Sequence, residues 1–190
     1  MIWWGIMSRV MQCIGLSLAL PVGCAVALAG STVAAENGGT APVPNLQAAA
    51  EQGPVAQALS KARVMNGPVN LAADYYIYVQ SASWCGPCKV EMPELVKLYP
   101  QMKAANVELI LVGQDGTEQA AMAYLQSFGA PFPGVHYQDE ALKALPGYTL
   151  SRTVPHATLV DKQGRLIAKG HGSLARKWQQ IIEDDREEEE

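Results

Sequence analysis

Two cysteines, Cys85 and Cys88, are separated by two residues in the motif Trp-Cys-Gly-Pro-Cys at residues 84–88. The other two cysteines of the chain, Cys13 and Cys24, lie in an apolar N-terminal stretch. A disulfide between neighbours this close closes a very small loop, so it removes little entropy from the unfolded chain and stabilises the fold weakly. We therefore expect the pair to serve chemistry, by cycling between a dithiol and a disulfide.

The residues on either side of the motif predict where its sulfur atoms lie. A strongly β-prone run, Tyr75–Val79, precedes the motif, and helical sequence follows over Gly86–Ala104. This order places Cys85 at a helix N-terminus, where unpaired backbone N–H groups and the helix dipole stabilise a thiolate, the form that attacks disulfides. Pro87 suits the first helical turn, where its missing N–H costs nothing. We expect Cys85 to be the nucleophile and Cys88, one turn further in, to be the resolving thiol.

Two other interpretations of the cysteine pair have less support. A zinc site would need two more ligands, and the available histidines stand alone rather than in pairs: His136, His156 and His171. A purely structural disulfide would contribute little, since its loop is so short. We expect no metal, and no cofactor other than a redox-active disulfide between Cys85 and Cys88.

Hydrophobic patterning along the chain predicts strands that alternate with helices. The expected strands after Tyr75–Val79 are Val107–Val112, His156–Val160 and Leu166–Lys169, the last two flanking a turn at 161–164. The expected helices after the motif are Glu118–Phe128, a short one over Asp139–Leu145, and Leu174–Ile182, with a proline-rich connection at 130–133. This order predicts an α/β fold, in which a mixed central β-sheet is flanked by helices on both faces.

The motif and its surroundings also resemble a known family. The segment Ser81–Leu95, Ser-Ala-Ser-Trp-Cys-Gly-Pro-Cys-Lys-Val-Glu-Met-Pro-Glu-Leu, is similar to the active-site segment of thioredoxin-like proteins, and within them to the exported TlpA/ResA group. Pro93 stands at the offset of that family's helix-kinking proline. The resemblance covers about 74–182 and implies a thioredoxin-like fold. It also implies that Trp84, with the Gly-Pro dipeptide Gly86 and Pro87, supports the active site.

A second segment, Thr153–Leu166, resembles the part of the family in which a cis-proline opens a strand facing the cysteines. The resemblance implies that Pro155 packs beside Cys85. It also implies that the backbone of Val154 pairs with an extended substrate strand, as in β-augmentation. The sequence alone leaves an ordinary strand-start proline open, because only about 5–6% of X–Pro bonds in folded proteins are cis.

The chain departs from many thioredoxins in one respect. They carry a buried aspartate six residues before the first cysteine, where this chain has Val79. The proton relay for Cys88 must therefore differ. Asp115, just after the second strand, and His156, just after Pro155, are candidates for an acid, a base or a group that tunes the thiol pKa. The alternatives are a turn or helix-capping aspartate and a plain strand histidine.

The N-terminal segment predicts export. Residues 1–35 carry a single charge, Arg9, and end in Val-Ala-Ala, which fits the small-residue cleavage pattern of a signal peptide. The uncharged run at 10–29 is also long enough for one membrane span, so an uncleaved anchor stays open. A lipid-modified Cys24 has less support, because the residues before it lack the leucine of such sites. We expect a periplasmic or other envelope location, with membrane contact only through a retained leader.

Composition divides the remainder of the chain. Residues 36–70 read as a linker with short helices over Leu46–Val64, interrupted at Gly53-Pro54, and residues 71–182 form the thioredoxin-like domain. Residues 183–190, seven acids and one arginine, read as a disordered tail, with docking as the minority interpretation. Residues 36–182 carry 12 basic and 11 acidic side chains without a basic cluster, which argues against nucleic acid as a partner.

The residues between the cysteines indicate the direction of electron flow. Gly-Pro is the dipeptide of thioredoxin, with a potential of about −270 mV, whereas strong oxidants lie near −120 mV. The sequence therefore predicts a reductase of protein disulfides in the envelope, which a membrane electron donor must recharge. A disulfide oxidase or isomerase is the alternative within the enzymes. Outside them stands a non-catalytic binding module that has kept the fold.

Overall fold

The computed structural model describes residues 53–188 of the chain. Six strands of this part form one sheet in the order β1-β4-β3-β2-β5-β6. Strands β2, β3 and β4 run parallel to one another, while β1, β5 and β6 each pair antiparallel with their neighbour. The predicted mixed sheet is thereby confirmed. The strands are β1 Val64–Met65, β2 Tyr75–Ser81, β3 Val107–Gly113, β4 Gly134–His136, β5 His156–Asp161 and β6 Leu166–His171.

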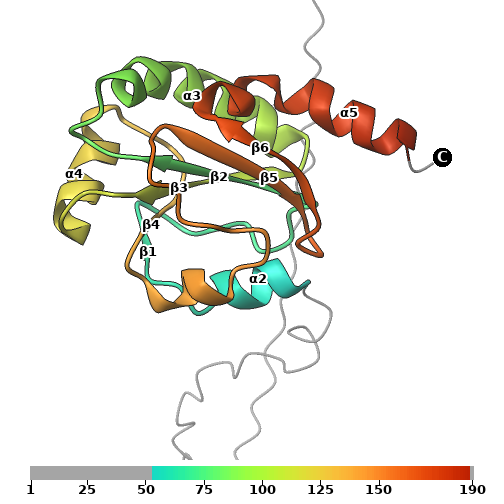
Figure 1. Cartoon of the computed structure of the whole chain (residues 1–190), viewed down its shortest axis with the longest axis horizontal. Helices are drawn as coiled ribbons and strands as arrows, with labels where there is room; N and C mark the ends of the chain where they lie inside the picture. The colour runs from blue at the N-terminus through green and yellow to red at the C-terminus, as the bar shows by residue number, and fades with distance from the viewer. Residues whose placement is uncertain (1–52, 189–190) are drawn as a thin grey trace, which may run out of the picture. The chain divides into compact units, whose positions relative to one another are not determined.

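Helices cover both faces of this sheet, as the sequence predicts. Figure 1 shows α3 and α5 on one side of the strands and α2 on the other. The hydrophobic core accordingly consists of two apolar clusters, one on the α3 side of the sheet and the other on the α2 side. The helices are α2 Pro54–Leu59, α3 Gly86–Ala104, α4 Glu118–Ser127 and α5 Trp178–Glu188, with the 3-10 helices η1 Glu140–Ala144 and η2 Gly172–Lys177.

Strand β2 lies at the centre and leads directly to the cysteine motif. All seven of its residues are buried, because the strand is covered on both faces. Ile77 and Val79 belong to the cluster on the α3 side, and Tyr76 and Tyr78 belong to the cluster on the α2 side. The aromatic and β-branched run thus fills two cores at once, and the strand extends two residues beyond the predicted end to Ser81.

Two short strands were not predicted from the sequence. Strand β1 lies within the segment 36–70 and pairs with β4, so the sheet begins before residue 71. Strand β4 directly follows the proline-rich connection at 130–133. With two and three residues respectively, neither strand is long enough to show the alternation that marks a strand in a sequence. The second of the two expected short helices begins at the predicted interruption, because α2 has Gly53 as its N-cap and Pro54 in its first turn, but it ends at Leu59 and not at Val64. The first expected helix lies outside the described residues.

The C-terminal region corrects the sequence-based prediction. The expected helix Leu174–Ile182 is a 3-10 helix followed by α5, which continues to Glu188. Residues 183–188 are therefore helical and not a disordered tail. The reason is a partly buried ion pair: Arg165 donates two hydrogen bonds of 2.7 and 2.9 Å to the carboxylate of Asp185. The sequence analysis missed this pairing, because a count of the charges in residues 183–190 does not reveal a partner that lies on another element.

The remaining predictions concern the end of α4, the cap of η1 and the N-terminal leader and linker. Helix α4 ends at Ser127, one residue before the expected end. Asp139 caps η1 by accepting a hydrogen bond from the Ala141 N–H, but the helix is of the 3-10 type. Signal peptide, membrane anchor and most of the linker lie outside the described residues. Over residues 53–188, none of the helices combines the length and apolarity that crossing a membrane requires.

Candidate active site

The two cysteines lie where β2 gives way to α3. Cys85 is the N-cap residue of α3, with extended backbone angles, and its sulfur accepts a hydrogen bond of 3.1 Å from the Cys88 N–H. Pro87 occupies the first helical turn. The expected placement of Cys85 at a helix N-terminus is confirmed. Its sulfur therefore lies among the unpaired N–H groups that stabilise an anion there.

Cys85 and Cys88 form a disulfide, with their Cα atoms 5.3 Å apart. Cys85 is 5% exposed and Cys88 only 1%, while the neighbouring Trp84 is 65% exposed. Gly86 and Pro87, between the cysteines, are also exposed. The Cys85 sulfur is thus the one nearer the surface, which matches the order of attack predicted for the pair. Within residues 53–188, no three His, Cys, Asp or Glu side chains group as metal ligands.

The loop that precedes β5 lies against the two cysteines. The Val154–Pro155 peptide bond is cis, as the family resemblance implies. The Val154 carbonyl oxygen lies 3.5 Å from the Cys85 sulfur, and the Val154 side chain packs against both cysteines and Ala82. Helix α3 and the cis-proline loop, 69 residues apart in the chain, therefore meet at this sulfur.

The loop is held in place by a buried amide that sequence reasoning missed. Gln80, near the end of β2, is fully buried. Its side chain donates to the Thr149 carbonyl at 2.8 Å and accepts from the Ser151 N–H at 2.7 Å. Gln114, at the end of β3, joins both by donating to the Gln80 side-chain oxygen at 2.9 Å and to the Ser151 carbonyl at 3.1 Å. This network fixes the residues that lead into Val154.

Asp115 anchors the turn before the motif. Its buried carboxylate accepts hydrogen bonds from the Ser83 N–H at 3.1 Å and from the Ser83 hydroxyl at 2.5 Å. It does not cap α4, because Thr117 does so by accepting from the Ala120 N–H. The structure thus gives Asp115 a positioning geometry next to Trp84, and an acid or base role for it stays a prediction.

His156 lies close to the site without touching the sulfur atoms through a hydrogen bond. It is the first residue of β5 and pairs in register with Gln80 on β2 and His171 on β6. Burial lowers the pKa of His156, and the neighbouring Lys169 and His171 lower it further. These surroundings therefore favour the neutral imidazole. A tuning role for it stays a prediction.

Glu91 is a site residue that the sequence analysis did not single out. It lies on α3 one turn after Cys88, is 9% exposed, and its Oε2 atom has no hydrogen-bond partner within residues 53–188. A methyl group at Gly172 would collide with this Oε2 atom and with Cβ of Pro155, so the carboxyl group lies against the cis-proline loop. The signal in the sequence was an acid on the helical face that also carries Cys88, Met92 and Leu95.

A shallow surface hollow of about 510 Å³ opens beside the motif, between α3 and α4. Ser83 and Lys89 line the side next to the cysteines, and Tyr124 and Phe128 line the other. The disulfide thus lies next to accessible surface on which another polypeptide could rest.

Comparisons with known proteins agree with this geometry. A family model described as thioredoxin-like matches residues 73–166. The thiol-disulfide oxidoreductase ResA of Bacillus cereus is 33% identical over 87 residues, which cover 46% of this chain and 49% of that protein. ResA of Bacillus subtilis is 28% identical over 92 residues, 48% of this chain and 50% of that protein. The chain thus spans about half the length of the curated relatives it matches.

A solved structure was also found to be similar. It is that of StoA from Bacillus subtilis, with 22% sequence identity and a TM-score of 0.43, covering 52% of this chain and 73% of that one.

Proposed function

Because this chain is a thioredoxin-like protein, we propose that it is a thiol-disulfide oxidoreductase which reduces disulfide bonds of exported proteins. The observation that carries the proposal is the position of Cys85. Its sulfur is at the N-cap of α3, 3.5 Å from the Val154 carbonyl oxygen, with Cys88 one turn deeper. The proposed nucleophile, the proposed resolving thiol and the Val154 backbone that would pair with the substrate thus lie next to one another.

The first chemical step is an attack by Cys85. In the dithiol form, the Cys85 thiolate attacks one sulfur of a substrate disulfide, so that a new S–S bond forms and the substrate S–S bond breaks. The released substrate sulfur leaves as a thiolate and takes up a proton. The N-terminus of α3 favours the thiolate that begins this step.

The second step releases the substrate. The Cys88 thiol loses its proton, and the resulting thiolate attacks the Cys85 sulfur of the mixed disulfide. The Cys85–Cys88 disulfide forms, and the second substrate sulfur leaves and is protonated. Two electrons and two protons have then passed from the protein dithiol to the substrate, and the protein is in the oxidised state seen in the structure.

The substrate segment would bind as an extended strand along Val154. Main-chain hydrogen bonds supply affinity in such pairing and depend little on side chains, which suits an enzyme that acts on several proteins. The exposed ring of Trp84 would border the bound segment on the side of the motif. The network around Gln80 would hold the Val154 backbone in position for this pairing.

Proton transfer to and from Cys88 needs a group other than the missing aspartate at Val79. We propose Glu91, because it lies one helical turn from Cys88 and its Oε2 atom has no hydrogen-bond partner among the residues that the structure describes. A buried carboxyl group without partners is costly for folding, and such groups cluster where chemistry uses them.

The oxidised protein must regain two electrons after each cycle. Because an exported reductant must be recharged, we propose a membrane electron-donor protein as the redox partner. The location in the periplasm or another envelope compartment rests on the apolar segment at residues 10–29. Mass spectrometry of the mature N-terminus would tell a cleaved leader from a retained anchor.

The proposed activity is tested by insulin reduction with dithiothreitol as electron donor. The wild-type domain should accelerate the reaction, and the Cys85→Ser variant should not exceed the uncatalysed rate. Equal rates for both proteins would instead indicate a binding module. The Cys88→Ser variant should accumulate a mixed disulfide with the substrate, because its second step is blocked.

The direction of electron flow is tested by the equilibrium potential in glutathione and dithiothreitol buffers. A reductase should lie near the thioredoxin value of about −270 mV. A value above about −180 mV, that of a disulfide isomerase, would favour the oxidase or isomerase alternative.

A further inference from the structure

We propose that His171, at the end of β6, is a positioning residue that connects the buried Glu91 carboxyl group to solvent and carries the protons which Glu91 exchanges. The inference rests on the proposed thiol-disulfide activity and adds the proton exit of that site. It starts from two contacts among α3, β6 and the cis-proline loop, and from the charged groups around them.

The first contact is between the Glu91 carboxyl group and the space beside Gly172 that holds it, which we call the seat of Glu91. Gly172, directly after His171, leaves room for Glu91 Oε2, since any Cβ at this position would collide with it. The Gly172 N–H donates to the Pro155 carbonyl oxygen at 3.2 Å, which ties the seat to the cis-proline loop. The carboxyl group is therefore enclosed by Pro155 and Gly172 on this side, and a proton cannot leave it there directly.

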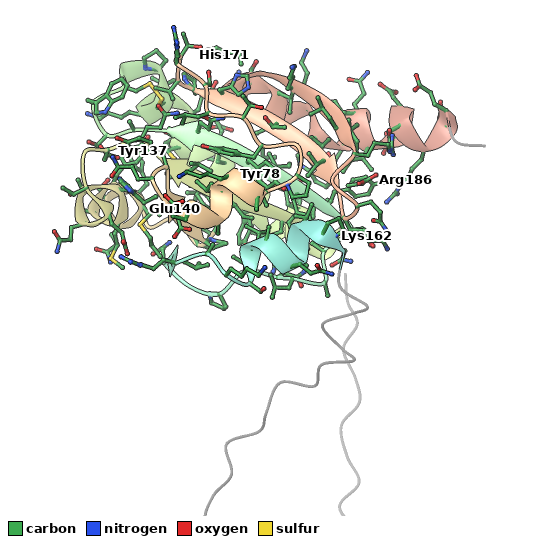
Figure 2. The ribbon with its side chains drawn as sticks, turned by 60° about the horizontal axis from the view of Figure 1, so that its bottom comes forward. Tyr78, Tyr137, Glu140, Lys162, His171 and Arg186 are labelled. Carbon is green, nitrogen blue, oxygen red and sulfur yellow. A yellow bond between two sulfur atoms is a disulfide. The ribbon has the colours of Figure 1, made fainter. Side chains whose placement is uncertain are left out.

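The second contact is between Glu91 and His171. The distance from His171 Nδ1 to Glu91 Oε1 is 3.7 Å. The Glu91 side chain is 11% exposed and that of His171 is 63% exposed, so the pair spans the boundary between the buried site and solvent. Figure 2 shows His171 at the margin of the described domain with its ring directed outward. At 3.7 Å a proton passes after a small ring rotation or through one bridging water.

The third observation concerns the other charged groups near this pair. Cys88 lies one turn before Glu91 on α3. On α4, burial raises the pKa of Tyr124, its hydrogen bond with Ser81 lowers it, and the charges of Asp115 and Glu91 raise it. His171 faces His156 on β5, which is partly buried. One turn beyond Glu91 on α3, the hydrogen bond from Lys97 lowers the pKa of Glu94, and the charge of Arg176 on η2 lowers it further.

His171 is therefore the group through which Glu91 reaches solvent among the described residues. The Ser173 N–H points to His171 Nδ1 at 3.5 Å, which favours the tautomer with Nδ1 as acceptor and the proton on Nε2. During the second chemical step, Cys88 gives its proton to Glu91. Glu91 passes it to His171 Nδ1, and the exposed Nε2 atom releases a proton to water.

The experiment follows the two steps separately with Ellman's reagent and the reduced full-length chain, in which Cys13→Ser and Cys24→Ser leave Cys85 and Cys88 as the two reactive thiols. Attack by Cys85 releases the first thionitrobenzoate, and attack by Cys88 on the mixed disulfide releases the second. The variants are His171→Ala, Glu91→Gln and the double variant, with Lys169→Ala, an exposed residue of the same strand, as the matched control. Circular dichroism and thermal unfolding establish that each variant is folded.

We expect His171→Ala to slow the second release about fivefold near neutral pH and to leave the first release within twofold, the size seen for coupled residues in contact. Free imidazole in the buffer should restore most of the lost rate, a rescue that a merely structural role would not allow. The double variant should be no slower than Glu91→Gln, and Lys169→Ala should resemble the wild type.

The inference is overturned if His171→Ala changes neither release, if imidazole fails to restore the rate, or if the effects of the two substitutions multiply. Its failure can be told from failure of the proposed function. A wild-type chain that reduces insulin while His171→Ala behaves normally refutes only the role of His171. A wild-type chain no more active than Cys85→Ser refutes both.

Discussion

Two glutamates are buried at opposite ends of the central strands, and their surroundings differ. Glu108, at the start of β3, accepts hydrogen bonds from the Tyr99 hydroxyl at 2.7 Å, the Lys103 ammonium at 3.0 Å and the Asn70 N–H at 3.2 Å. Glu91, near the carboxyl ends of the strands, has one oxygen without a hydrogen-bond partner in the described part of the chain and a histidine at 3.7 Å from the other.

The two sets of contacts suit Glu108 to a structural role at one end of the strands and Glu91 to proton transfer at the other end. A buried carboxylate that is fully paired ties its neighbours together, and removing it leaves those neighbours unsatisfied. A buried carboxyl group with spare capacity contributes little to stability but can take up and release a proton. The predictions below test whether this division between Glu108 and Glu91 holds.

The largest effect is expected at the paired carboxylate. Glu108→Ala should lower the free energy of unfolding by about 3 kcal/mol, because Tyr99 and Asn70 lose their partner and Lys103 its counter-charge. Urea denaturation measures the change. The matched control is Glu94→Ala, since Glu94 pairs with Lys97 on exposed surface and should matter little. Equal stability of Glu108→Ala and the wild type would contradict the structural role of Glu108.

A smaller loss is expected when the seat of Glu91 is filled. Gly172→Ala should destabilise the fold by about 2 kcal/mol, as overpacking of a close contact does. Gly116→Ala is the control, because nothing lies within 4 Å of a Cβ at that position. If the collision is with Glu91, adding Glu91→Ala to Gly172→Ala should recover part of the lost stability. No recovery in the double variant would place the strain elsewhere.

The sequence could predict the parts of the fold that depend on local signals, but not those that depend on partners far along the chain. The buried strand Tyr75–Val79 and the helix after the motif carry strong local signals, so their positions were predicted within two residues. Strands β1 and β4 owe their existence to pairing with each other and with β3, and a two- or three-residue segment carries no such signal. Similarly, Asp185 is ordered by Arg165, a partner 20 residues away that charge counting cannot assign.

The candidate site divides in the same way. The motif and its neighbouring segments predicted Cys85 at a helix N-terminus, because that placement depends on nearby sequence. The cis bond before Pro155 was implied only by the family resemblance. Glu91 and Gln80 were missed, because what distinguishes them is burial together with specific partners from loops far along the chain. Only the packed structure brings Glu91 against Gly172.

Replacing Glu91 should change activity more than stability. In Glu91→Gln we expect the second, Cys88-dependent step of disulfide exchange to slow at least about tenfold, since a group that accepts a proton is lost. The free energy of unfolding should stay near that of the wild type or rise, because an under-paired buried carboxyl group is removed. Stopped-flow thiol exchange and urea denaturation measure the two quantities. A large loss of stability with normal exchange would give Glu91 the structural role assigned to Glu108.

The smallest effect should appear in alkaline solution at the Glu108 end. Burial raises the pKa of Tyr99, and its hydrogen bond to Glu108 and the charge of that carboxylate raise it further. The unfolded chain therefore loses the Tyr99 proton at lower pH than the folded chain, so the stabilising contribution is complete below about pH 10 and declines as the pH rises above it. Between pH 10 and pH 11, Tyr99 should account for a loss of about 1 kcal/mol.

Urea denaturation of the wild type and of Tyr99→Phe at pH 9, 10 and 11 measures this contribution. The variant should be less stable at pH 9, because Glu108 loses a hydrogen bond, and its stability should fall less steeply as the pH rises. Glu108→Gln should also reduce the slope, since it removes the charge that opposes ionisation of Tyr99. Parallel pH dependences in all three proteins would mean that the Tyr99–Glu108 pair does not control alkaline stability, and the contrast with Glu91 would lose its electrostatic basis.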